Sequence, residues 1–333
     1  MDPLSSRLAQ VRARQVLRQS GLPHDGELQR ASSTNNEAFV GQHHVIRTNT
    51  EMNGRLSREG NLYPHLPANP MSPARVACGT DNSADYLVIE RRPGGALAHA
   101  WPDLSREQRR DAVHQLGTYL AQLHTTVTPS HLPRLRRCPQ LLDGETRPLT
   151  APLLSGIREL DQNASIDRGL LADVSRHVAD NLHHLDDFDE RHLVHGDLTF
   201  ENLLWDGNRL SAIIDFEWSR GGPADLDLDV LARCCAFPKL HVATDHVDRT
   251  RPEDYADVLP WMAEVHPTLF EHPALFERLV IYALSFEIGL LLRNPVQGAR
   301  RGLGPEHPLN RIAALLGSGG HVADQLHAVG VLH

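Results

Sequence analysis

The chain has 333 residues, of which 41% are hydrophobic and 23% charged, and its formal net charge is −9. This composition is that of a globular protein with one large domain or two unequal lobes. The negative charge argues against a general nucleic-acid binder, which needs a basic face to neutralise phosphates. Residues 1–20 lack a signal-peptide core, and the longest apolar run, Leu279–Leu284, is too short to cross a bilayer. We therefore expect a cytoplasmic protein without a membrane partner.

Cysteine, histidine and lysine usage narrows the chemistry. None of the four cysteines forms a C-x-x-C pair, so buried, reduced thiols are expected. The 21 histidines show no H-E-x-x-H and no zinc spacing, which argues against a transition-metal site. Lys239 is the only lysine, so the motif G-x-x-x-x-G-K-[ST] is absent and arginine must fill roles that usually fall to lysine.

The N-terminal segment predicts a small sheet with one inserted helix. A weak helical stripe over residues 4–17 comes first, and a second helix is expected at about Glu51–Leu66. Short alternating segments bounded by turn residues predict four strands: Glu37–Val40, His43–Thr48, Ala74–Gly79 and Asp85–Arg91.

A glycine-containing break at Pro93-Gly94-Gly95 predicts a connection to a second, mainly helical lobe. Ser105 and Gln108 form a capping box at the start of an apolar-striped helix. The five prolines of Pro129–Pro152 predict an irregular segment, and Leu275–Leu292 is apolar all round, as in a helix buried within a lobe. We therefore divide the chain into residues 1–92 and 93–333.

A hairpin is predicted where Asp206-Gly207-Asn208 separates two apolar runs, Leu203–Trp205 and Leu210–Ile214. Asn202 precedes the first run and Asp215 follows the second, so folding brings both side chains to the open end of the hairpin.

A third polar side chain, Asp197, lies one short loop before Asn202. Oxygen ligands such as Asn202 and Asp215 suit Mg²⁺, which takes its other ligands from water and substrate phosphates. A neighbouring aspartate can then orient a hydroxyl and accept its proton as it attacks phosphorus. The alternative is that these residues only cap turns by accepting local backbone N–H groups.

The order of these residues favours the first interpretation. His195-Gly196-Asp197, an asparagine five residues after that aspartate, a hairpin and Asp215-Phe216-Glu217 follow the order of a kinase catalytic loop and metal-binding segment. They resemble the signatures H-G-D-x-x-x-x-N and I-D-[FW]-[ED] of the aminoglycoside phosphotransferase and choline kinase superfamily. Gly196, Glu217 and the lack of a following A-P-E argue against a protein kinase.

The resemblance covers about residues 30–235 and implies an α+β, two-lobed, protein-kinase-like fold. Its smaller lobe, an antiparallel sheet with one helix, would bind the nucleotide, and its larger, mainly helical lobe would carry catalysis and substrate binding. It also implies ATP or GTP as donor, Mg²⁺, and a hydroxyl of a small molecule as acceptor. By this analogy Asp197 is the catalytic base, and Asn202 and Asp215 are the metal ligands.

In the smaller lobe, the resemblance calls for a cation on the third strand and an acid on the helix. Arg47 is the only basic residue of its predicted strand, and Glu59 shares the apolar stripe of the following helix. An acid on a buried face needs a partner. We expect Arg47 and Glu59 to pair and to contact the nucleotide phosphates; the alternative is that both face solvent.

Two further segments are expected at the nucleotide. The segment 32–36, which includes Ser33, Thr34 and Asn35, stands where protein kinases have a glycine-rich loop and could cradle phosphate, although any turn could use such a cluster. The backbone around Glu90 is expected to contact the adenine by fold analogy.

Acidic residues concentrate after the metal-binding segment. Residues 215–277 hold thirteen acidic and five basic residues, and Asp225 and Asp227 alternate shortly after Gly221-Gly222-Pro223. A carboxylate-rich wall predicts a cationic acceptor such as an amino sugar, an aminoglycoside or a choline-like amine. The alternative is that these acids cap a helix. Glu217 could support a second Mg²⁺ or bind an amine of the acceptor.

Three rival functions remain open at this point. They are a nucleotide-binding pseudokinase, a protein kinase, and a kinase of a neutral metabolite such as a sugar or homoserine. We expect a monomer or a homodimer, and an antibiotic-resistance role stands beside self-protection, biosynthesis and salvage.

Overall fold

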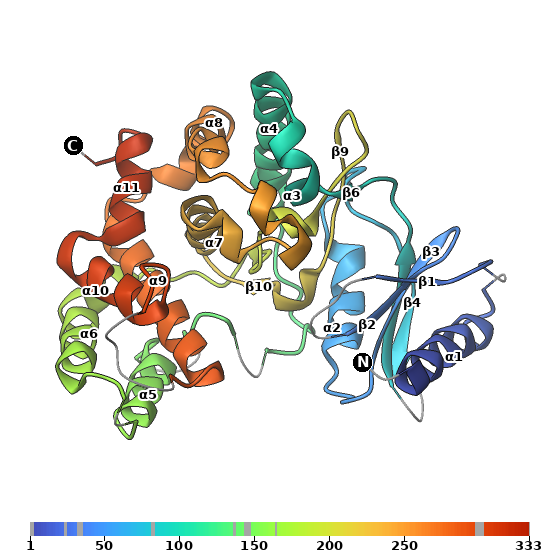
Figure 1. The fold of residues 1–333 in the computed structure, drawn as a ribbon, viewed down its shortest axis with the longest axis horizontal. Helices are drawn as coiled ribbons and strands as arrows, with labels where there is room; N and C mark the ends of the chain where they lie inside the picture. Colours follow the sequence, from blue (N-terminus) through green and yellow to red (C-terminus); the bar gives the residue numbers. More distant parts are fainter. Residues whose placement is uncertain are drawn as a thin grey trace.

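The structure is a computed structural model that describes residues 3–22, 25–31, 36–80, 84–135, 138–142, 148–163, 165–296 and 303–332. It has two lobes, one built on a sheet with two helices and one mainly helical (Figure 1). The predicted α+β, two-lobed architecture is therefore confirmed. The exact division at residue 92 stays a prediction.

The N-terminal lobe is a five-stranded antiparallel sheet. Its order is β1-β2-β3-β5-β4, with β1 (Gln29–Ala31), β2 (Glu37–Val40), β3 (His44–Asn49), β4 (Arg75–Thr80) and β5 (Asp85–Glu90). Apolar side chains of β2, β3 and β5 alternate between its two faces, so each face can bury a helix. The three-residue strand β1 was not predicted, because Gln-Arg-Ala carries no apolar alternation.

One helix covers each face of this sheet (Figure 1). The helix α1 (Pro3–Gln19) buries Ala13 and Val16 against Ile46 and Val88. The helix α2 (Arg55–Leu62) buries its apolar side against the opposite face and is shorter than predicted, because it continues only as a 3₁₀ turn over Tyr63–His65.

Gly60 allows α2 to lie close to the sheet. A Cβ at this position would stand 2.5 Å from the Cβ of Cys78 on β4. No real Cβ tolerates such a distance, so a side chain here would push α2 away from the sheet. Because α2 also carries Glu59, this close packing fixes the depth at which Glu59 enters the lobe.

The predicted break between the lobes is itself part of a sheet. The strand β6 (Gly95–Ala96) pairs with β8 (Leu203–Trp205), which pairs with β9 (Leu210–Ile213) in the predicted hairpin. Gly94 has φ 101° and lies against the carbonyl of Trp205, so only glycine fits there. The connection between the lobes is thus bonded directly to the hairpin that carries the site.

The C-terminal lobe contains short helical turns and nine helices within the described residues. Ser105 Oγ accepts the backbone N–H of Gln108, and Gln108 Oε1 accepts that of Ser105, which confirms the predicted capping box. The helices are α3 (Leu97–Ala100), α4 (Arg106–Leu123), α5 (Ala151–Leu160), α6 (Arg168–Asn181), α7 (Asp225–Ala236), α8 (Val258–Val265), α9 (Leu275–Arg293), α10 (Pro308–Ser318) and α11 (Gly320–Ala328). A short pair of strands, β7 (Leu193–Val194) and β10 (Arg220–Gly221), joins the catalytic loop to the segment before α7.

The helix α9 lies at the centre of this lobe, as its apolar sequence predicted. It packs against α5, α7 and α10 (Figure 1). None of the helices in the described ranges is long and apolar enough to cross a membrane. All four cysteines are free; Cys234 and Cys235 are buried, whereas Cys78 and Cys138 are partly exposed.

Candidate active site

The hairpin β8–β9 brings the predicted metal ligands together. Leu203 pairs with Ile213, and the backbone N–H of Ile214 donates to the carbonyl of Asn202 at 2.9 Å. Asn202 therefore lies beside the residue that precedes Asp215, at the open end of the hairpin.

Asp197 is held next to Asn202 by two hydrogen bonds. The side-chain amide Nδ2 of Asn202 donates to the carbonyl of Asp197 at 2.8 Å and to its Oδ2 at 3.3 Å. Burial and the nearby carboxylate of Asp215 raise the pKa of Asp197 to about 7, although the Asn202 amide opposes this shift. A carboxylate with a pKa near 7 is well matched to accept a proton at neutral pH.

His195 fixes the start of the catalytic loop as a neutral imidazole. Its Nε2 lies 3.0 Å from the carbonyl of Ile214, and its Nδ1 accepts the backbone N–H of Asp197 at 3.3 Å. Burial lowers the pKa of His195 even though Asp227 opposes this effect. The neutral Nε2–H tautomer satisfies both contacts, and the ring thereby connects the Asp197 loop to β9.

Asp227 supports the same loop from below and does not face an acceptor. It is fully buried, and its two oxygens accept the backbone N–H groups of His195 and Gly196, each at 2.8 Å. His124 Nε2 lies 3.0 Å from Oδ2 and holds the pKa of Asp227 below its usual value against the effect of burial. The prediction that Asp227 binds the acceptor was therefore wrong, because no part of its carboxylate is accessible.

The same correction applies to Asp225. Its carboxylate is buried against Arg278, whose Nε and Nη2 both donate to it, and Tyr282 donates its hydroxyl at 3.2 Å. Asp225 thus joins α7 to α9 inside the lobe. Asp225 and Asp227 thus form internal contacts rather than a wall facing an acceptor.

Arg47 and Glu59 form the predicted pair. Nη1 of Arg47 donates to both carboxylate oxygens of Glu59 at 2.8 Å, and Glu59 Oε1 also accepts the backbone N–H of Phe216 at 3.1 Å. Nη2 of Arg47 reaches Asp215 at 2.8 Å and Glu217 at 3.5 Å. Burial alone would lower the pKa of Arg47, but Asp215 and Glu59 hold it well above its ordinary value.

The backbone of Asp215 is unusual. Its φ of 65° and ψ of 60° place a non-glycine residue in the left-handed region, which costs about 1–3 kcal/mol. Such a conformation persists only where surrounding contacts hold it. In this conformation the Asp215 side chain, one third exposed, contacts Arg47.

The charge balance of this cluster fits a divalent cation. Three carboxylates, those of Glu59, Asp215 and Glu217, contact one guanidinium. Burial and the two neighbouring carboxylates raise the pKa of Glu59 despite the Arg47 contact, which reflects this surplus of negative charge. In the described part of the chain, no group of three or more histidine, cysteine or acidic side chains could hold a metal alone. Carboxylate oxygens such as these are ligands that a hard divalent cation prefers.

The structure describes only some of the remaining residues that were predicted to contact the nucleotide. Ser33, Thr34 and Asn35 lie outside the described residues. The adjacent Asn36 donates to Glu217 at 3.1 Å, so this end of the loop reaches the cluster. Glu90 ends β5, and its half-exposed side chain lies 3.3 Å from Arg92.

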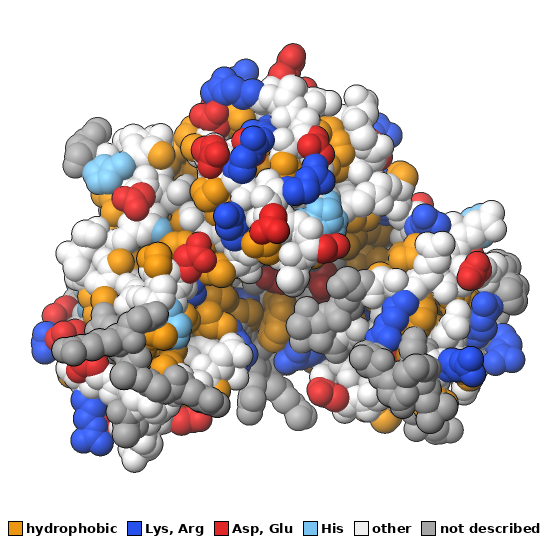
Figure 2. Space-filling view, in the orientation of Figure 1, with side chains coloured by type: hydrophobic (Ala, Val, Ile, Leu, Met, Phe, Trp, Pro, Cys, Tyr) orange, Lys and Arg blue, Asp and Glu red, His pale blue; other side chains and the backbone are white. Residues whose placement is uncertain are grey.

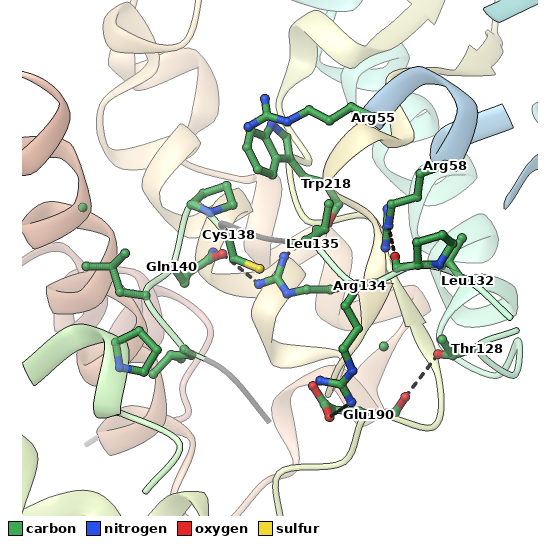
Figure 3. A pocket seen from close by; sticks show the side chains of 18 of the residues that line it. Arg55, Arg58, Thr128, Leu132, Arg134, Leu135, Cys138, Gln140, Glu190 and Trp218 are labelled. Atoms are coloured by element: carbon green, nitrogen blue, oxygen red, sulfur yellow. Dashed lines mark hydrogen bonds and ion pairs between the residues drawn. The ribbon is translucent and has the colours of Figure 1, made fainter. Parts of the chain in front are cut away.

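A large cavity lies beside this cluster and was not predicted. It has a volume of about 1590 Å³ and is lined by α2, the segments 127–135 and 138–142, β10 and the C-terminal end of α9 (Figure 3). The guanidinium of Arg55 stacks over the ring of Trp218 at 4.5 Å at one end of it. The space-filling view shows the surface hollowed between the two lobes (Figure 2). Its lining residues come from distant segments, so no local sequence signal could have identified it.

Comparisons with known proteins agree with this arrangement. A family model described as "Phosphotransferase enzyme family" matches residues 40–274. The GDP complex of wild-type aminoglycoside 2'-phosphotransferase-IIIa is similar, with a TM-score of 0.63, 15% identity, and coverage of 95% of this chain and 99% of that one. ADP-bound aminoglycoside phosphotransferase APH(2'')-Ib gives a TM-score of 0.60, 17% identity, and coverage of 93% and 97%.

A third similar structure is the streptomycin–ATP complex of APH(2'')-IIa, with a TM-score of 0.57, 20% identity, and coverage of 83% and 89%. Comparison with curated protein sequences gave no significant match. These structural similarities support the kinase-like fold. Because the family match spans most of the chain and includes both Asp197 and Asp215, the protein belongs to the phosphotransferase enzyme family.

Proposed function

We propose that this small-molecule phosphotransferase transfers the γ-phosphate of ATP or GTP, with Mg²⁺, to a hydroxyl of a small acceptor. The observation that carries the proposal is the joint placement of Asp197, Asn202 and Asp215 at one end of the hairpin, with Arg47 facing Asp215. Turn capping alone does not account for this grouping, because Asp215 bonds a guanidinium from the other lobe.

Asp197 acts as the base in this proposal. Its pKa of about 7 leaves it able to take the proton of the acceptor hydroxyl at neutral pH, while Asn202 orients its carboxylate. His195 and Asp227 act as positioning residues, because they hold the backbone of the loop on either side of Asp197.

Asn202 and Asp215 are the residues that would hold Mg²⁺, and bound Mg²⁺ would neutralise charge on the transferring phosphate. Arg47 supplies the fixed positive charge for the nucleotide phosphates, in the place where other kinases use lysine. Glu59 holds Arg47 in this position through two hydrogen bonds. Glu217 contacts both Arg47 and Asn36 and thereby connects the loop over the nucleotide to the cluster.

The acceptor is a small molecule in this proposal. Similar structures contain streptomycin, gentamicin or hygromycin B, at 17–20% identity to this chain. The expectation of a cationic acceptor rested on the acidic balance of residues 215–277, and two of its named carboxylates, Asp225 and Asp227, are buried and do not support it. The chemical class of the acceptor is inferred from the cavity beside the site.

The proposal is tested by ADP formation with Mg²⁺ and ATP across a panel of small alcohols, with Asp197→Asn as the inactive control. Acceptor-dependent ADP formation that disappears in the variant is expected. Nucleotide binding without turnover of any acceptor would instead favour a pseudokinase. Labelling of a generic polypeptide with no turnover of a small alcohol would favour a protein kinase.

A further inference from the structure

The cavity beside the active site is strongly basic. Among the described residues, its lining contains six arginines and two acidic residues, Glu159 and Glu190. A chain with a net charge of −9 would by chance line a cavity with more acids than bases. The excess of arginine is therefore a local feature that needs a physical explanation.

Two of the six arginines already have acidic partners. Arg134 lies 3.7 Å from Glu190 (Figure 3), and Arg191 lies 2.8 Å from Asp189. These pairs are largely exposed, and they neutralise the rim of the cavity.

Arg58 is the most deeply buried of the others and forms no ion pair with the described residues. It is 5% exposed, and its Nε and Nη2 donate to the backbone carbonyls of Pro133 and Ser219. Its buried Nη1 has no hydrogen-bond partner among the described residues. Burial and the neighbouring Arg220 lower the pKa of Arg58 to about 10, although Cys138 and Glu59 oppose this shift.

Arg220 presents a second guanidinium with only neutral partners. It donates to the carbonyl of Trp218 at 3.2 Å and to Oε1 of Gln140 at 2.9 Å, and within the described chain it forms no ion pair. A Cβ built on Gly196 would lie 3.0 Å from its Nη1, so the guanidinium lies against the catalytic loop, one residue before Asp197. The positive end of the cavity thus borders the proposed catalytic base.

We propose that this cavity binds the acceptor through a carboxylate or phosphate group held near Arg58 and Arg220, so that the acceptor is an anionic hydroxy compound. The inference rests on the proposed function and specifies its substrate class. A buried and a partly buried guanidinium without ion-pair partners among the described residues are costly, and an oxyanion relieves that cost for both. The planar guanidinium fork binds carboxylates and phosphates in two-pronged geometry. A polycationic amino sugar would meet like charge in this cavity.

Matched probes that differ in charge test the proposal. Glucose 6-phosphate and gluconate are anionic, glucose is neutral, and glucosamine and kanamycin are cationic. Each is assayed with Mg²⁺ and ATP for ADP formation and for the phosphorylated product, in the wild type and in Arg58→Gln, Arg220→Gln and Arg191→Gln. Arg191→Gln is the matched control, because it removes a lining arginine that Asp189 already neutralises.

A second readout does not depend on phosphoryl transfer. Thermal unfolding is followed with inorganic phosphate, gluconate, glucose and kanamycin, so that loss of anion binding and loss of catalysis are separated. Arg220 is only partly buried, so Arg220→Gln remains informative if Arg58→Gln fails to fold.

Anions are expected to raise the unfolding temperature and to be phosphorylated with at least tenfold higher kcat/KM than neutral or cationic probes. Arg220→Gln should lower this kcat/KM about tenfold or more, as expected for loss of a charged hydrogen bond, and Arg191→Gln should not. Preference for the cationic probes, or anion binding that ignores Arg58 and Arg220, would overturn the inference. Anions that bind through these arginines but are never phosphorylated would overturn the acceptor assignment and define an effector site. Absence of phosphoryl transfer to any probe would count against the proposed function alone.

Discussion

Replacing Asp227 by asparagine should destabilise the loop that carries Asp197 and lower the free energy of unfolding. The carboxylate accepts two backbone N–H groups and contacts His124, all within 3.0 Å and fully buried. Asparagine keeps one acceptor oxygen, and its amide nitrogen must then face either a backbone N–H or His124. With the oxygen facing His195 and His124, the interaction with the Gly196 N–H is lost and the other two no longer involve a charged acceptor, in a site from which water is excluded.

The expected magnitude follows from these contacts. A hydrogen bond to a charged group contributes about 1.5–3 kcal/mol to the free energy of unfolding. Loss of one such bond, with the other two reduced to neutral hydrogen bonds worth about 1 kcal/mol less each, predicts that Asp227→Asn lowers this free energy by about 3–5 kcal/mol, a large share of the roughly 5–15 kcal/mol typical of a domain. The backbone at 195–196 sets the direction of Asp197, so kcat of any folded variant protein should also fall.

Urea denaturation of the wild type, Asp227→Asn and Asp173→Asn measures this effect. Asp173 is half-exposed and lies 2.8 Å from Arg176, so its replacement should change the free energy of unfolding by no more than about 0.5 kcal/mol. A loss below about 1 kcal/mol in Asp227→Asn, or an equal loss in both variants, would refute the view that Asp227 supports the loop.

Three further predictions concern the site itself. Asp197 must be ionised to accept a proton and its pKa is raised to about 7, so kcat/KM should rise with pH through about 7. Asp215→Asn should move this midpoint to lower pH, because it removes a repelling charge. A flat profile of kcat/KM from pH 5.5 to 8 would count against Asp197 as the base. Arg47→Met leaves three carboxylates without their cation and should lower the free energy of unfolding by about 3–5 kcal/mol. Arg47→Lys should keep the fold but raise KM for ATP. Equal unfolding midpoints for both variants would contradict a stabilising role of these ion pairs. Gly196→Ala should lower the unfolding temperature measurably, because Gly196 has φ 82° and an added Cβ would lie 2.4 Å from a backbone carbonyl. An unchanged unfolding temperature would show that the loop adapts to the side chain.

The parts of the site that depend on local pattern could be predicted from the sequence. The Asp-Gly turn and two apolar runs define the hairpin, and the hairpin brings Asn202 and Asp215 together whatever surrounds it. The pairing of Arg47 with Glu59 follows from one acid on an apolar helical stripe and one base on the neighbouring strand.

The parts that depend on three-dimensional packing could not be predicted. Asp225 and Asp227 resemble exposed acids in the sequence, and only the burial of α7 on all sides places them in internal contacts. The sequence gives the number of acidic residues in 215–277, but it does not indicate which of them contact Arg278 or backbone N–H groups inside the lobe. The basic cavity combines arginines from α2, β10 and α9, and no periodicity connects such distant positions.

The most direct test of the account is phosphoryl transfer at Asp197. Wild type and Asp197→Asn are incubated with Mg²⁺, ATP and an acceptor, and the phosphorylated product is quantified by mass spectrometry alongside the ATP dissociation constant and the unfolding temperature. The account predicts that the variant binds ATP and unfolds as the wild type does, while product formation falls about 10²-fold or more. Undiminished product formation in a folded Asp197→Asn variant would contradict it.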